Sequence, residues 1–125
     1  MRLLLDSHVL IWLMGEDARL TAEARSLITG ATAVFVSTAS FWELSIKASL
    51  GKLRLDIERL ADLLDAAGIQ ELQITRRHVL SVARLPLLHR DPFDRLLVAQ
   101  ANAEIMRLVT NDPKLAPYSD LVVMV

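Results

Sequence analysis

Short apolar runs alternate along the chain with longer stretches whose apolar residues recur at helical spacing. The short runs predict strands buried in a sheet, and they lie at residues 3–5, 34–36, 72–74, 108–110 and 121–125. The third run contains a glutamine and fits the edge of the sheet better than its centre. The longer stretches predict helices within residues 7–14, 21–30, 41–50, 57–68, 75–85 and 91–101. Because strands and helices alternate without internal repeats, we expect an α/β three-layer sandwich, with helices on both faces of a central parallel sheet of about five strands.

Capping residues set the expected ends of several helices. Thr75 is a typical N-cap, Pro86 ends the helix that follows it, and Asp91-Pro92 begins the last helix. The segment Ser40-Phe41-Trp42-Glu43 matches a capping box. That box would place Glu43 in the first turn of its helix.

Composition narrows the class of protein. With 125 residues, 53% of them hydrophobic, we expect a single domain over residues 1–125 with a sizeable core and an apolar surface for self-association. No apolar run approaches the ~18 residues of a membrane span, and an aspartate interrupts the N-terminal leucines, so we expect neither a transmembrane segment nor a signal peptide. The lack of cysteine excludes disulfides, thiol nucleophiles and thiolate metal sites, and it favours the cytoplasm.

Four acids occupy positions that an α/β sandwich brings to one edge. Asp6 follows the first predicted strand, and Asp112 follows the fourth. Glu43 and Asp94 lie in the first turns of predicted helices. Ligands of such folds bind at the carboxyl ends of the strands, where we expect the four side chains to converge. Converging carboxylates repel one another, so the cluster is typical of a site for a hard divalent cation, Mg²⁺ or Mn²⁺.

Each acid by itself also has an ordinary structural interpretation. Acids near helix N-termini are favoured by the backbone dipole and by capping, and the sequence around Asp112 is a common turn. These interpretations do not predict that all four acids share one edge of the sheet. The net charge of −1 excludes neither a polyanionic nor a neutral partner, since 14 basic residues face only 11 acids once the four are set aside.

Four ordered segments resemble PIN-domain ribonucleases, and the group they resemble most is the toxins of VapBC-type toxin–antitoxin pairs. The resemblance spans essentially the whole chain, in the segments Leu4-Leu5-Asp6-Ser7-His8-Val9-Leu10, Phe41-Trp42-Glu43-Leu44-Ser45-Ile46-Lys47 with Leu50-Gly51-Lys52-Leu53, His89-Arg90-Asp91-Pro92-Phe93-Asp94-Arg95-Leu96-Leu97-Val98-Ala99-Gln100-Ala101, and Val109-Thr110-Asn111-Asp112. It implies a metal-dependent endoribonuclease toxin that hydrolyses RNA and is controlled by a cognate antitoxin protein. From the apolar excess we also expect a homodimer or a larger toxin–antitoxin assembly.

The resemblance also implies roles for individual residues. The expected catalytic and metal-binding residues are Asp6, Glu43, Asp94 and Asp112, which would hold Mg²⁺ or Mn²⁺. Asp6 and Asp94 would be the main ligands, Glu43 a water-mediated ligand or proton acceptor, and Asp112 part of a second, weaker metal position. Asp91 also matches the motif but is better explained as a helix cap.

Neighbouring polar residues have expected roles beside the acids. Ser7, Thr110 and Asn111 would orient the carboxylates or the attacking water. Arg95 would contact the RNA backbone, and Lys47 fits either a phosphate contact or an ion pair with Glu43 one turn away. The lone histidines His8 and His78 are expected to be structural, and the aromatic residues Trp12, Phe41 and Trp42 are expected to be core or subunit contacts. An antitoxin arginine is the best partner group for the acidic edge, because its planar fork binds carboxylates in pairs.

Two other classes of protein remain open at this point. A phosphoacceptor signalling domain is similarly short and α/β, but it would need an adjacent acid pair after the first strand, where this chain has Asp6, Ser7 and His8. A non-catalytic α/β binding module would use the acids only as helix caps. Loss of Mn²⁺ binding in an Asp6→Asn variant would favour the metal site, and labelling by a phosphoryl donor would favour signalling.

Overall fold

The computed structural model describes residues 1–125 and contains one parallel sheet of five strands. The strands are β1 Arg2–Leu5, β2 Ala33–Ser37, β3 Gln70–Leu72, β4 Arg107–Thr110 and β5 Val122–Met124. Their order across the sheet is β3-β2-β1-β4-β5, and every neighbouring pair is parallel. The predicted fold class is confirmed. The third strand lies at the edge, as expected, although it begins two residues before the predicted run.

Six α-helices and one 3-10 helix connect the strands. They are α1 Ser7–Met14, α2 Ala22–Thr29, α3 Thr38–Ser49, α4 Ile57–Ala66, α5 Arg76–Val82, α6 Pro92–Glu104 and η1 Pro113–Tyr118. The short helix η1 was not predicted, and α5 ends earlier than the sequence indicated. None of these helices has the length and apolar character needed to cross a membrane.

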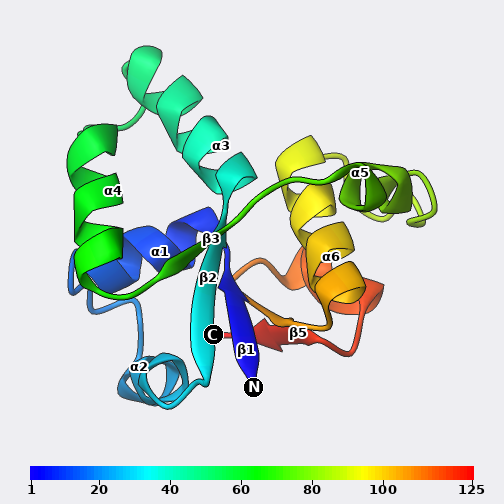
Figure 1. Cartoon of the computed structure of the whole chain (residues 1–125), viewed down its shortest axis with the longest axis horizontal. Helices are drawn as coiled ribbons and strands as arrows, with labels where there is room; N and C mark the ends of the chain where they lie inside the picture. Colours follow the sequence, from blue (N-terminus) through cyan, green and yellow to red (C-terminus); the bar gives the residue numbers. More distant parts are fainter.

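Strand β1 is the centre of the core because its alternate side chains serve both faces of the sheet. Leu3 and Leu5 belong to the larger apolar cluster, with residues of α1 to α4, whereas Leu4 packs into a second cluster with residues of α6 and η1. All three leucines are almost fully buried. Figure 1 shows α1, α2 and α4 to one side of the sheet and α5 and α6 to the other. The apolar run that opens the chain is therefore a central strand covered on both faces.

The chain winds outward from β1 in two directions. It first passes through β2 to the edge strand β3, then crosses back to β4 on the other side of β1 and ends at β5 (Figure 1). A parallel sheet of this kind has its ligand crevice where the winding direction reverses, outside the carboxyl ends of the strands. Here that point lies between β1 and β4, and the backbone N–H of Asp6 donates to Val109 O across it at 3.0 Å.

Helix α3 begins three residues earlier than the predicted capping box requires. Its N-cap is Ser37, whose side chain accepts from the backbone N–H of Ala39 at 3.0 Å. Strand β2 therefore runs directly into the helix, and Ser40 lies inside its first turn. The Ser40 hydroxyl is buried without a hydrogen-bond partner, and Glu43 lies in the second turn. The prediction of a Ser40–Glu43 capping box was wrong, so capping cannot account for Glu43.

This start of α3 predicts opposite effects for two serine-to-alanine variants. Ser37→Ala removes a helix cap and should lower the free energy of unfolding by about 1 kcal/mol. Ser40→Ala removes a buried hydroxyl that makes no hydrogen bond, so it should leave that free energy unchanged or raise it. Urea unfolding of both variants measures the difference. A larger loss for Ser40→Ala than for Ser37→Ala would restore the predicted capping box.

Candidate active site

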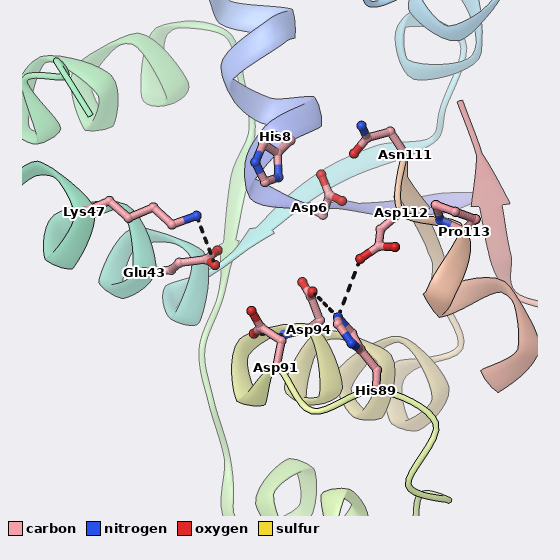
Figure 2. Close-up of a pocket in the computed structure, with 10 residues that line it drawn as sticks. All are labelled: Asp6, His8, Glu43, Lys47, His89, Asp91, Asp94, Asn111, Asp112 and Pro113. Carbon is pink, nitrogen blue, oxygen red and sulfur yellow. Dashed lines mark hydrogen bonds and ion pairs between the residues drawn. The ribbon is translucent and has the colours of Figure 1, made fainter. Parts of the chain in front are cut away.

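An acidic pocket of about 410 Å³ opens at the carboxyl ends of β1 and β4. Figure 2 shows the ten residues that line it, which are Asp6, His8, Glu43, Lys47, His89, Asp91, Asp94, Asn111, Asp112 and Pro113. Five of these residues are carboxylic acids and only one is a lysine. All four acids that the sequence analysis assigned to one edge therefore meet here, and Asp91 joins them.

Asp6 is fixed by the junction between β1 and α1. One of its carboxylate oxygens caps α1 by accepting from the backbone N–H of Val9 at 2.9 Å, and the other accepts from the hydroxyl of Thr110. Burial raises the pKa of the Asp6 carboxyl, although both hydrogen bonds and the nearby His8 act in the opposite direction. Thr110 also accepts from the backbone N–H of Asp112 at 3.1 Å. The hydroxyl of Thr110 thus joins two of the acids across the switch point.

Glu43 enters the pocket from α3 and is held by two neighbours. Its Oε1 atom accepts from the hydroxyl of Ser7 at 2.8 Å, and its Oε2 atom lies 3.5 Å from Lys47 Nζ (Figure 2). The Glu43 side chain is buried, whereas that of Lys47 is 37% exposed. The i, i+4 ion pair is therefore present, and Lys47 brings one positive charge to the mouth of the pocket.

Asp94 lies in the first turn of α6 and faces His89. Its Oδ2 atom is 2.9 Å from His89 Nε2, which in turn lies 3.5 Å from Asp112 Oδ2 (Figure 2). Burial raises the pKa of Asp94 to about 6; the hydrogen bond from His89 opposes this, while the charges of Asp91 and Glu43 add to it. Asp91 is the N-cap of α6 and accepts from the N–H groups of Phe93 and Asp94, as predicted.

Asp112 and Asn111 come from the turn after β4. Asp112 caps η1 by accepting from the backbone N–H of Lys114 at 3.0 Å, and its carboxylate also lines the pocket. Asn111 lines the pocket at the same turn. Both residues therefore lie where we expected them, and the carboxylate of Asp112 serves both as the cap of η1 and as part of the pocket lining.

Arg95 is buried, although we expected it to contact the RNA backbone. It is 9% exposed, and its guanidinium donates to Pro86 O at 2.9 Å, to Val82 O at 3.0 Å and to the hydroxyl of Tyr118 at 3.1 Å. A buried guanidinium whose N–H groups bind backbone carbonyls stabilises the loop before α6 and has few N–H groups left for a phosphate. The side chain of Arg95 therefore holds the loop before α6 in place, and this loop carries His89.

Three residues near the pocket were not identified from the sequence. His89 was not assigned to the metal site and His8 was expected to be structural, yet both line the pocket. Tyr118 accepts from the N–H groups of Leu88 and His89, at 3.1 and 2.8 Å. The position of His89 just before the Asp91 cap was the one available signal for it. Tyr118 belongs to the unpredicted η1, so nothing local indicated its role.

The donor set of the pocket suits a divalent cation. Hard cations prefer carboxylate oxygens, and a positive ion would relieve the repulsion among five neighbouring acids. Burial raises the pKa of Asp94 and the charges of Asp91 and Glu43 add to this, so a positive ion would favour its charged form. Ligand atoms of His89, Asp94 and Asp112 all lie within 4.8 Å of one another. The residues present therefore fit a metal-binding site.

Comparisons with known proteins identify similar chains. The family model for the PIN domain matches residues 3–121. Ribonuclease VapC22 of Mycobacterium tuberculosis is 35% identical over 117 residues, which cover 92% of this chain and 90% of that protein.

Solved structures share the fold. VapBC2 from Rickettsia felis, bound to a DNA fragment from its promoter, gives a TM-score of 0.72 at 16% identity and covers 100% of this chain and 98% of its own. A toxin–antitoxin complex from Klebsiella pneumoniae gives a TM-score of 0.67 at 16% identity and covers 97% of this chain and 95% of its own. FitAcB from Neisseria gonorrhoeae also gives a TM-score of 0.67 at 16% identity and covers 98% of this chain and 96% of its own.

The raised pKa of Asp94 predicts a pH-dependent gain in stability when its charge is removed. Between an ordinary pKa of 3.8 and the folded value of about 6, the folded protein holds a proton that the unfolded chain releases. Stability from this group therefore falls as pH rises through that window. Asp94→Asn should raise the melting temperature of the metal-free protein more at pH 8 than at pH 5. Thermal unfolding in the presence of a chelator tests this, and an equal shift at both pH values contradicts it.

Proposed function

This chain belongs to the PIN-domain family, and from that premise we propose that its acidic pocket is the catalytic centre of a VapC-type ribonuclease toxin. The protein is a hydrolase that acts on RNA phosphodiester bonds. The observation that carries the assignment of the site is the convergence of Asp6, Glu43, Asp94 and Asp112 in one pocket at the reversal point of the sheet. Ribonuclease VapC22, similar over nearly its whole length, supports the activity.

The proposed cofactor is Mg²⁺ or Mn²⁺, held by Asp6 and Asp94 with help from Glu43 and Asp112. When bound, such an ion neutralises phosphodiester charge and lowers the pKa of a water molecule that can then attack phosphorus. The pocket has the carboxylate oxygens for this task, and the charge of Lys47 at its mouth suits the anionic backbone of RNA.

The residues around the acids fix the carboxylates before substrate arrives. The Val9 N–H and the Thr110 hydroxyl hold both oxygens of Asp6, so this side chain has little freedom left to lose. Ser7 holds Oε1 of Glu43 and leaves Oε2 to Lys47 and to a proton from the attacking water. Groups positioned in advance cost no reorganisation at the moment of reaction. We propose that Ser7 and Thr110 act through the acids that they position.

We further propose that an antitoxin protein controls this activity. The similar structures include a complex named toxin–antitoxin and one named VapBC2, which supports a partner of this class. Apolar side chains are exposed at Ile46 on α3, at Leu50 directly after it and at Leu63 on α4, where a partner helix can bury them. Self-association stays a prediction from the apolar excess, and the exposed side chain of Trp42 is one candidate contact.

The catalytic assignment predicts that single charge removals abolish RNA cleavage without unfolding the protein. Asp6→Asn and Asp94→Asn keep the shape of the side chain, and asparagine is as good an N-cap as aspartate, so α1 should stay intact. Each variant should lose at least about a hundredfold in metal-dependent cleavage of a labelled RNA, a loss of ~2.7 kcal/mol in transition-state stabilisation.

Asp65→Asn is the matched control, because it removes the same charge from an exposed position on α4 outside the pocket. It should cut RNA like the parent. Glu43→Gln should lose activity in the same assay, because the structure leaves it no capping role. Cleavage at the parental rate by folded Asp6→Asn and Asp94→Asn variants would overturn the catalytic assignment.

The antitoxin proposal predicts competition between an arginine and the metal ion. An antitoxin guanidinium that enters the pocket can bind carboxylates in pairs, so Mn²⁺ affinity should be lower in the complex than in the toxin alone. Changing that arginine to alanine should restore the affinity. Isothermal titration with Mn²⁺ measures both effects. Equal affinities, with full inhibition by the alanine variant, would mean that the partner blocks RNA access and leaves the carboxylates alone.

A further inference from the structure

His89 is the one nitrogen donor placed between two of the pocket's carboxylates. Its Nε2 atom lies 2.9 Å from Asp94 Oδ2 and 3.5 Å from Asp112 Oδ2 (Figure 2). We propose that His89 is itself a ligand of the divalent cation and binds it through Nε2 beside these two acids. The proposal rests on the proposed function, because it requires an ion in this pocket.

The spacing of the three donor atoms fits octahedral coordination. With metal–ligand bonds of about 2.1 Å, neighbouring ligands at right angles lie about 3 Å apart and opposite ligands about 4.2 Å apart. The separations of 2.9 and 3.5 Å are close to the value for neighbouring ligands, and all three atoms lie within 4.8 Å of one another. One ion can therefore contact His89, Asp94 and Asp112 with little movement of the side chains.

The loop that carries His89 is fixed by contacts that an ordinary surface histidine does not need. The hydroxyl oxygen of Tyr118 accepts from the backbone N–H groups of Leu88 and His89. Arg95 donates to the same oxygen and to Pro86 O. The His89 side chain is only 14% exposed as a result. Ligands held by a second layer of hydrogen bonds bind metal more tightly, so this scaffold makes Tyr118 and Arg95 positioning residues for the site.

The proposal also predicts which ion the pocket prefers. Mg²⁺ favours oxygen ligands and water, whereas imidazole nitrogen suits transition-metal ions. A pocket that adds one imidazole to its carboxylates should therefore favour Mn²⁺ over Mg²⁺. The competing interpretation is that His89 only forms a hydrogen bond to Asp94. In that case the ion would have oxygen ligands alone, and His89 would contribute nothing to the choice between the two ions.

Electron spin-echo spectroscopy of the Mn²⁺-loaded protein tests the coordination directly, since a bound nitrogen modulates the echo. The chain has three histidines, which makes the assignment simple. His8 lines the same pocket and His78 is buried against Glu104. The parent and the matched control His8→Gln should show nitrogen modulation, and His89→Gln should lose it. His89→Gln should also weaken Mn²⁺ binding at least about tenfold, and Mg²⁺ binding less, in isothermal titration.

A second variant separates the ligand from its scaffold. Tyr118→Phe removes the oxygen that holds the loop and leaves all pocket-lining side chains in place. It should weaken Mn²⁺ binding by a smaller factor than His89→Gln and keep the nitrogen modulation. Melting temperatures measured without metal establish that each variant is folded.

The outcomes distinguish this proposal from the proposed function. Mn²⁺-dependent RNA cleavage by a parent protein without nitrogen modulation would overturn the ligand role of His89 and leave the ribonuclease assignment standing. Modulation that survives in folded His89→Gln would also overturn it. Nitrogen modulation in a protein that does not cleave RNA would support the ligand role and contradict the catalytic assignment. Failure of the parent to bind Mn²⁺ would overturn both.

Discussion

Mutual repulsion of carboxylates is the constraint on which the rest of this structure depends. Five acids share one pocket, and burial raises the pKa of Asp6 and of Asp94. The fold opposes this repulsion with backbone N–H groups and hydroxyls that donate hydrogen bonds to the carboxylates. Asp6, Asp91 and Asp112 each cap a helix, so the dipole of that helix favours the negative charge. Three of the five acids are thus held by helix ends, whereas Glu43 reaches the pocket from the second turn of α3.

The sheet topology explains why acids from distant segments meet. Asp6 and Asp112 follow β1 and β4, which are neighbours in space although about a hundred residues of chain separate them. Because the winding direction reverses between these strands, no crossover helix covers the gap at their carboxyl ends. Helices α3 and α6 then contribute Glu43 and Asp94 to the same pocket (Figure 2). The reversal of winding between β1 and β4 leaves room for the pocket, and the residues that follow these two strands supply Asp6 and Asp112.

Local signals in the sequence were sufficient to locate the strands and most of the helices. They were also sufficient to predict that the four acids lie at one edge of the sheet. The apolar run before Asp6 and the Asp91-Pro92 start of α6 were interpreted correctly, because strand burial and capping depend on neighbouring residues. The predicted capping box at Ser40 was wrong because β2 continues directly into α3 with Ser37 as the N-cap. Ser37 and Ser40 are both suitable caps by sequence, and only the register of the sheet shows which of them ends the strand. The roles of Arg95 and Tyr118 depend on partners 9 to 30 residues away, which no local pattern encodes.

The double use of Asp6 as helix cap and pocket acid has a genetic consequence. A toxin gene that loses its activity is released from the cost of poisoning its own cell, and inactive alleles should therefore accumulate. Replacement by asparagine keeps the cap of α1, whereas replacement by alanine or valine removes it and destabilises the product. Under the proposed function, alleles carrying asparagine would encode inert but folded copies that still present the exposed side chains of Ile46, Leu50 and Leu63 to an antitoxin. Such copies would bind antitoxin and leave active toxins in the same cell uninhibited. The protein from an inactivated gene would then harm its host through binding alone.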